Sequence, residues 1–255
     1  MNLTASFRSE LLKTKRTSIW YTCLLIALVA PVILVLDDYD TKETIGRLAA
    51  GPWQWVYKSG GQMLNILLLP LFVVLTCTLL PQLEYRNNTW KQVLATPQTY
   101  GQLFLAKLAL PFFMILAFLL VFNCLVLFAA ILLGTMYPGI RLADHSFAWR
   151  EVLRFNGQTI AAILGVLGFQ FWMGLRSRSF LLPIGLGVGL WILSAMLVFE
   201  YKWADADKFP FAFPFLNVYP KYAEKVPTMQ LYSAGYFVLF VALAFVDFRF
   251  RKPKA

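Results

Sequence analysis

Six long apolar stretches constrain the fold of this chain more than any other feature of its sequence. A helix needs about 20 mainly apolar residues to cross the hydrocarbon layer of a membrane, and each stretch is close to that length. We therefore predict an all-α integral membrane protein with six transmembrane helices, in which residues 1–255 form a single membrane domain. The predicted spans are 19–36, 63–83, 108–133, 157–175, 179–199 and 229–246.

The positive charge of the chain alternates along the sequence. The formal net charge is +10, and the seven polar segments around the six spans do not share it equally. The first, third, fifth and seventh segments hold 13 Lys and Arg residues against three acids (Glu10, Glu84 and Asp247), whereas the other three hold ten of each. Cytoplasmic segments of membrane proteins carry the excess of Lys and Arg. We therefore expect both termini in the cytoplasm.

The composition argues against several classes of function. Hydrophobic residues make up 59% of the chain and charged residues 14%, against about 45–50% and about 25% in soluble domains. The basic residues flank the spans, where anionic headgroups explain them, so we expect contact with membrane lipid and no nucleic-acid partner. A single histidine, His145, and the lack of any Gly-Lys pair exclude a two-histidine metal site and a P-loop. We expect no catalytic residue, no metal and no cofactor on this chain.

Residues outside the spans predict further helices and loops. Leu3, Phe7 and Leu11 recur every four residues with basic residues on other faces, which predicts an amphipathic helix on the inner headgroup layer. Residues 37–58 are predicted to form an outer loop that ends in two interfacial tryptophans.

Proline and glycine predict details of the spans. Pro70 predicts a kink in the second span. Gly185 and Gly189 predict a face of small residues at which another helix packs closely.

The stretch 208–227 holds four prolines and six aromatic residues, which is unusual for a solvated loop. One interpretation is anchoring of the rings at the membrane interface. The other is a re-entrant or gating element near a translocation path.

Asn65, Asn123 and Gln170 are the notable uncharged polar residues in or near the spans. We find no ionisable residue at mid-depth, so the spans offer no proton relay. The three amides can hydrogen-bond between helices or line a translocation path. A transporter of this kind must take its energy from a partner.

The cytoplasmic segment 84–107 has the pattern of two helices joined by a tight corner. Thr89 and Gln92 match a capping box, which predicts the start of a short helix. Thr96 as N-cap and Pro97 as first residue then predict a second helix, which continues toward Pro111.

This segment resembles the signature of type-2 ATP-binding-cassette (ABC) exporter permeases. In that family a Glu ends the second span, and a Gly/Asn-Thr pair, an aliphatic pair, a Pro and a Lys follow before the third. The matching residues are Glu84, Asn88-Thr89, Val93-Leu94, Pro97 and Lys107. The N-terminal amphipathic helix is also similar to the opening of the family, and relatives of this size include bacterial permeases for lantibiotic and bacitracin self-protection and drug efflux.

The resemblance implies the permease subunit of an ATP-driven exporter in the bacterial cytoplasmic membrane. It also implies a dimer with a second copy or a paralogous permease, and a separate cytosolic ATPase that holds ATP and Mg. The implied ATPase-coupling residues are Glu84, Arg86, Thr89, Trp90, Lys91, Val93, Leu94 and Pro97. The alternative is a non-transporting scaffold or sensor that binds another cytosolic protein through 84–107.

Overall fold

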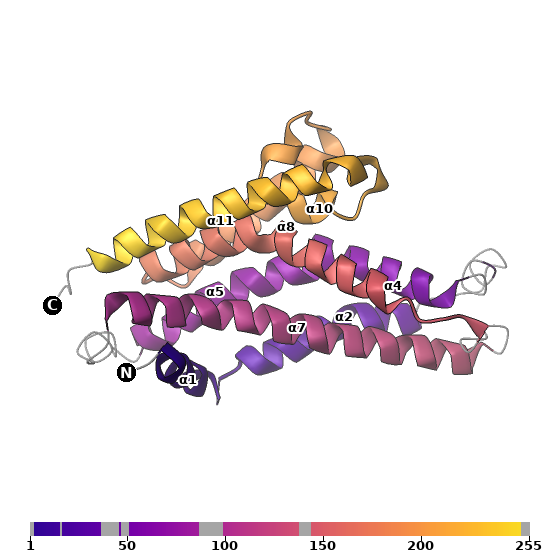
Figure 1. Cartoon of the computed structure of the whole chain (residues 1–255), viewed down its shortest axis with the longest axis horizontal. Helices are drawn as coiled ribbons and strands as arrows, with labels where there is room; N and C mark the ends of the chain where they lie inside the picture. Colours follow the sequence, from indigo (N-terminus) through magenta and orange to yellow (C-terminus); the bar gives the residue numbers. More distant parts are fainter. Residues whose placement is uncertain are drawn as a thin grey trace.

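The computed structural model describes residues 3–15, 17–36, 46, 51–86, 99–137 and 144–250, and the regular structure in those ranges is entirely helical. Six helices among these residues are long and apolar enough to cross a membrane. They form an elongated bundle, and the beginning and the end of the chain lie at the same end of it (Figure 1). The fold class predicted from the sequence is confirmed.

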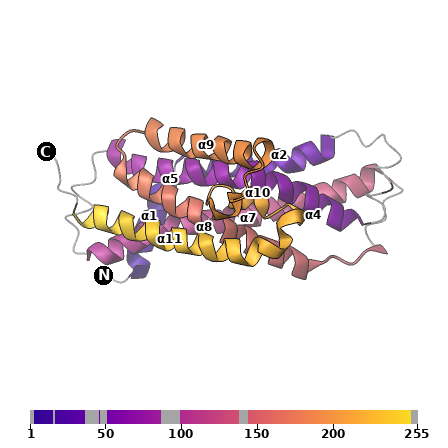
Figure 2. The same ribbon diagram turned by 90° about the horizontal axis from the view of Figure 1, so that it is seen from above.

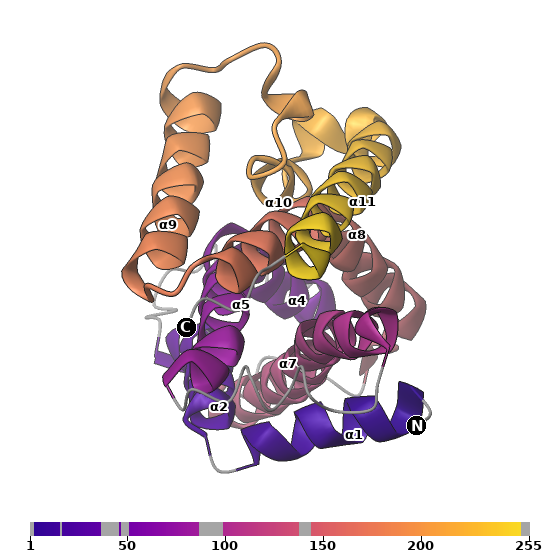
Figure 3. The same cartoon turned by 90° about the vertical axis from the view of Figure 1, so that its left-hand side faces the viewer.

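The helices are α1 (Leu3–Thr14), α2 (Ile19–Leu36), α4 (Pro52–Met63), the π-helix η1 (Leu64–Leu68), α5 (Leu69–Arg86), α7 (Tyr100–Met136), α8 (Trp149–Arg176), α9 (Leu181–Ala195), the π-helix η3 (Met196–Glu200), the short η4 (Ala206–Lys208), α10 (Phe213–Leu216), η5 (Pro220–Lys225) and α11 (Val226–Arg249). We refer to the two ends of the bundle as the α1 end and the α4 end. Figure 3 looks onto the α1 end, where α1 runs crosswise along one side of the bundle, beside α7.

The first span matches its predicted range, whereas the second begins earlier than predicted. Helix α4 starts at Pro52, so residues 52–58 are helical and the predicted loop 37–58 is wrong over this part. Proline at the first helical position is pre-organised for a helix, and Val56 is buried in the core. Lys58, Gly60 and Gly61 interrupt the apolar residues before Met63. The second span was therefore predicted to begin only at Met63.

Helix geometry changes next to Pro70, where a kink was predicted. The π-helix η1 ends at Leu68, two residues before Pro70. Proline has no N–H, so it leaves the carbonyl four residues earlier without its usual donor. The indole Nε1 of Trp191 in α9 donates to that carbonyl, the Ile66 oxygen, at 2.7 Å. The hydrogen bond that proline removes is thus replaced from a neighbouring helix.

Helix α8 occupies the middle of the bundle because its glycines let neighbouring backbones come close. A Cβ on Gly174 would lie 2.1 Å from the carbonyl oxygen of Cys77 in α5. A Cβ on Gly168 would lie 3.0 Å from the Cα of Phe237 in α11. Figure 2 shows α8 beside α11, with α9 at one edge of the bundle.

The glycines that the sequence singled out in α9 do not make the predicted contact within this chain. A Cβ on Gly185 or on Gly189 would meet no described atom within 4 Å. Gly187, which lies between them, faces inward instead, and its Cβ position is 2.2 Å from Nε2 of Gln170. A close contact of Gly185 and Gly189 with a helix of another chain stays a prediction, whereas the rotation of α9 within this chain follows from its packing partners.

The aromatic stretch after α9 folds back into the bundle. Phe211, Phe213 and Phe215 are at most 3% exposed, and α10 packs against α8, α11 and η1. Interfacial anchoring is therefore wrong for these rings. The re-entrant interpretation agrees with their burial, whereas a gating role stays a prediction.

Candidate functional site

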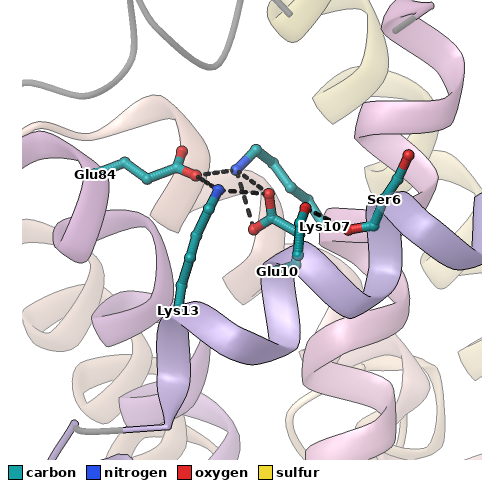
Figure 4. Close-up of polar contacts among 6 residues, drawn as sticks. Ser6, Glu10, Lys13, Glu84 and Lys107 are labelled. Atoms are coloured by element: carbon teal, nitrogen blue, oxygen red, sulfur yellow. Dashed lines mark hydrogen bonds and ion pairs between the residues drawn. The ribbon is translucent and has the colours of Figure 1, made fainter. Parts of the chain in front are cut away.

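Four charged side chains from three helices meet at the α1 end of the bundle (Figure 4). Lys13 Nζ lies 2.7 Å from Oε1 of Glu10 and 2.7 Å from Oε1 of Glu84. Lys107 Nζ also donates to Oε1 of Glu84, and it lies 3.4 Å from each carboxylate oxygen of Glu10. Each lysine thus bridges both carboxylates, and we call these four residues the charge cluster.

A polar stripe on α1 brings Glu10 to this position. Ser6, Glu10 and Thr14 recur every four residues, and all three are buried, so they occupy one face of the helix, against α7. The apolar Leu3, by contrast, remains 46% exposed. The helix predicted from the sequence is present, and it contacts α7 both through Phe7, whose ring lies 5.8 Å from that of Phe113, and through this buried polar stripe. The four-residue spacing of Ser6, Glu10 and Thr14 is the feature of the sequence from which this buried polar face could have been predicted.

The charge cluster is largely removed from solvent. The side chains of Glu84, Lys107 and Glu10 are 4%, 7% and 7% exposed, and that of Lys13 is 35% exposed. Two carboxylates and two ammonium groups balance, which is the condition for burying charge. The pKa of Lys13 is raised above its usual value: burial lowers it, but the carboxylates of Glu84 and Glu10 raise it by more.

This raised pKa predicts a stability difference at alkaline pH. Lys13 stabilises the fold fully below its unfolded pKa of about 10.5, and that contribution is lost as the pH rises through its higher folded value. In detergent, Lys13→Met should melt several degrees below wild type at pH 8. The difference should shrink only above about pH 10.5. Lys15→Met changes an exposed neighbouring lysine and is the control. If the difference in melting temperature between Lys13→Met and wild type is unchanged up to pH 11.5, the raised pKa of Lys13 is contradicted.

The charge cluster joins the two helices on either side of residues 87–98. We call these residues the coupling segment, because most of the predicted ATPase-coupling residues lie in it. Glu84 lies near the end of α5 and Lys107 lies near the start of α7, so their ion pair holds the two chain ends around residues 87–98 together. The end of α5 is also tied to α8 and to the turn after it. Tyr85 donates to the Leu175 carbonyl at 2.6 Å, and Gln82 donates to the Arg178 carbonyl at 3.3 Å.

Most of the predicted ATPase-coupling residues lie outside the described part of the chain. They are Thr89, Trp90, Lys91, Val93, Leu94 and Pro97, together with the predicted capping box at 89–92 and the predicted helix start at 96–97. Of the remaining two, Glu84 is in the charge cluster and Arg86 is exposed at the end of α5. Their role in coupling stays a prediction.

Helix α7 begins later than the sequence predicted. Its N-cap is Thr99, which is extended (φ −71°, ψ 147°) and therefore interrupts any helix that starts at Pro97. The Thr99 hydroxyl accepts from the Gln102 N–H at 3.3 Å, and the Gln102 side chain accepts from the Thr99 N–H at 3.5 Å. This Thr-x-x-Gln pattern is a capping box, and it was visible in the sequence.

Two of the amide side chains in the spans make hydrogen bonds between helices. Asn65 donates to the Thr159 hydroxyl at 3.0 Å and accepts from Asn217 at 3.2 Å. Asn123 and Asn156 donate to each other's side-chain oxygens at 3.0 and 3.2 Å. These bonds match the first of the two roles predicted from the sequence. A place on a translocation path stays a prediction.

Gln170 differs from the other two amides. Gln170 is fully buried, and neither Nε2 nor Oε1 of its side chain has a hydrogen-bond partner among the described residues. The amide lies beside Gly187 of α9. A buried amide without partners is costly, so this contact is a weak point between α8 and α9.

A second polar contact at the α1 end links α8 to α11. Oδ2 of Asp247 accepts from Trp172 Nε1 and from Arg176 Nη1, each at 2.7 Å. All three acids of the Lys- and Arg-rich segments (Glu10, Glu84 and Asp247) are therefore paired with basic residues at one end of the bundle.

A family model described as ABC-2 family transporter protein matches residues 6–194. The matched range begins in α1 and ends in α9, so it includes all four residues of the charge cluster. No curated protein matches the chain.

Proposed function

The chain belongs to the ABC-2 transporter family of membrane components, and on this premise we propose that it is the permease subunit of an ATP-driven exporter. A separate cytosolic ATPase binds ATP and Mg and hydrolyses the nucleotide. The permease forms the translocation path with a second copy or a paralogous chain. The complex resides in the bacterial cytoplasmic membrane, with the α1 end in the cytoplasm, in agreement with the excess of Lys and Arg at that end.

The charge cluster is the observation that supports this proposal most strongly. Residues 87–98 connect two helices whose ends are joined by the Glu84–Lys107 pair. A displacement of this segment by a bound ATPase would move α5 and α7 together, because separating them would break a buried ion pair. Lys13 and Glu10 extend the connection to α1. The four charges thus form a junction that carries motion into the bundle.

The coupling segment supplies the contact with the ATPase in this proposal. Trp90, Lys91, Val93 and Leu94 dock into a groove of the ATPase, and Thr89 and Pro97 shape the two ends of the docking helix. Glu84 and Arg86 hold the segment at the membrane surface. Asn65, Asn123 and Gln170 are the candidates for the translocation path.

Co-purification tests the docking assignment. A P-loop ATPase encoded beside this chain should co-purify with it, and its hydrolysis rate should respond to the permease. Trp90→Asp or Leu94→Asp should reduce the retained ATPase at least tenfold, because a charge would enter an apolar contact.

Tyr201→Asp is the matched control, since Tyr201 is exposed and follows η3, away from the α1 end at which α9 begins. If the Trp90 and Leu94 variants retain as much ATPase as this control, the docking segment is assigned wrongly. If the wild type retains another cytosolic protein and no ATPase, the scaffold or sensor hypothesis replaces the exporter.

A further inference from the structure

A cavity of about 410 Å³ opens between α4 and α8 at the α4 end of the bundle, far from the charge cluster. Its volume is within the range of small-molecule sites, about 300–1,000 Å³. Both helices begin at this end (Figure 1) and open helical runs that are long and apolar enough to cross a membrane. The residues of α4 and α8 that line the cavity precede the apolar stretches predicted at 63–83 and 157–175, so we expect the cavity at the level of the lipid headgroups.

The wall of this cavity is aromatic and held in place by its own contacts. Trp53, Tyr57, Phe147 and Phe155 all line it. The ring of Phe147 packs 5.3 Å from that of Trp53 and 5.7 Å from that of Tyr57. Trp53 Nε1 donates to the His145 carbonyl at 3.0 Å. The wall is therefore formed before any ligand arrives, and it suits an apolar group.

Two opposite charges line the cavity without meeting. Lys58 comes from α4 and Glu151 from α8, and both are exposed. No ion pair or hydrogen bond joins either side chain to another residue in the described ranges. Because the two charges do not neutralise each other, both remain available to a molecule that carries a cationic and an anionic group.

A third polar group lines the same cavity. Asn217 donates through Nδ2 to Asn65. Its Oδ1 is buried and accepts no hydrogen bond from the described residues. An unsatisfied buried acceptor is costly unless a donor reaches it. This oxygen has no exposed surface in the cavity, so a ligand does not reach it and the ligand contacts fall to the two charges and the aromatic wall.

We propose that this cavity binds a zwitterionic amphiphile from the lipid layer at the α4 end. The anionic phosphate group pairs with Lys58, and the ammonium group pairs with Glu151. The hydrocarbon part lies against the aromatic wall. A phosphoethanolamine lipid has this chemistry. The binding requires no ATPase and is independent of the proposed coupling segment.

Lysophosphatidylethanolamine binding to the delipidated full chain in detergent tests the proposal, measured by native mass spectrometry. Wild type should show one saturable site per chain. Lys58→Met and Glu151→Gln should each weaken binding about tenfold, the value of one charge-assisted contact. Val152→Trp, which fills the cavity from α8, should remove the site. Lys221→Met and Glu224→Gln change exposed charges outside its lining and should bind like wild type.

Three results would overturn the proposal. The first is unchanged affinity in both Lys58→Met and Glu151→Gln, which are exposed surface changes that leave the fold intact. The second is equal affinity for lysophosphatidylglycerol, which lacks the ammonium group. The third is full competition by free phosphoethanolamine, which would identify a site for a soluble zwitterion. A negative result here leaves the co-purification test of the exporter unaffected.

Discussion

Lys107→Met should lower the free energy of unfolding by about 3–5 kcal/mol, because it removes one of the two ammonium groups that the charge cluster provides for its two buried carboxylates. The two carboxylate side chains are 4% and 7% exposed, so bulk water solvates them poorly once this partner is lost. A loss of this size is a large part of the roughly 5–15 kcal/mol that stabilises a typical domain. The measurement is the unfolding free energy in mixed micelles.

A charge-balanced double variant is the control for this prediction. Lys107→Met combined with Glu84→Gln leaves the Glu10–Lys13 pair at 2.7 Å intact. It should recover much of the stability that either single change removes, since unpaired buried charge is the main cost. If the double variant is as unstable as the sum of the two single variants, the two groups are not coupled and the junction is assigned wrongly.

The stable double variant also distinguishes an effect on folding from an effect on the coupling between the ATPase and the permease. It retains the bundle but lacks the link between the ends of α5 and α7. Under the proposed function, the ATPase should still bind to it, while hydrolysis should no longer respond to the permease. If hydrolysis still responds normally to a well-folded double variant, the charge cluster has no role in coupling.

Gly174→Ala should destabilise the bundle by about 3 kcal/mol, at the upper end of the cost of overpacking. The new Cβ would lie 2.1 Å from a backbone oxygen of α5. A backbone atom cannot move out of the way as a side chain can, so α5 and α8 would have to separate. We expect a lower melting temperature and faster proteolysis at the α1 end.

Two other glycines provide matched controls for this substitution. Gly187→Ala would meet two side chains, Nε2 of Gln170 at 2.2 Å and Cγ2 of Val74 at 2.8 Å, and no backbone atom, so its cost should be smaller than that of Gly174→Ala. Gly185→Ala would meet no described atom within 4 Å, and alanine is the better helix former by about 1 kcal/mol. From the most to the least stable, the expected order of the variants is Gly185→Ala, Gly187→Ala and Gly174→Ala. Equal effects at all three sites would show that helix propensity, and not contact with α5, decides the outcome.

Some local features were readable from the sequence and others were not. The start of α7 at Thr99 was readable, because a capping box depends on residues three positions apart. The inward rotation of Gly187 was not, because either face of α9 is apolar and only its neighbours choose between them. The early start of α4 was hidden because Lys58 and two glycines interrupt an otherwise apolar run.

The number of spans and the charge difference between the two sets of connecting segments follow from the sequence alone. The reason is that a membrane helix satisfies its backbone hydrogen bonds within its own segment, so length and apolarity suffice to identify it. The meeting of Glu10 with Lys107, which are 97 residues apart, was decided only by the tertiary structure. So were the cavity between α4 and α8 and the contact of Gly174 with Cys77. These features depend on how whole helices pack against one another. The periodicity of one helix can mark its buried face, as Ser6, Glu10 and Thr14 do in α1, but it does not specify which helix packs there.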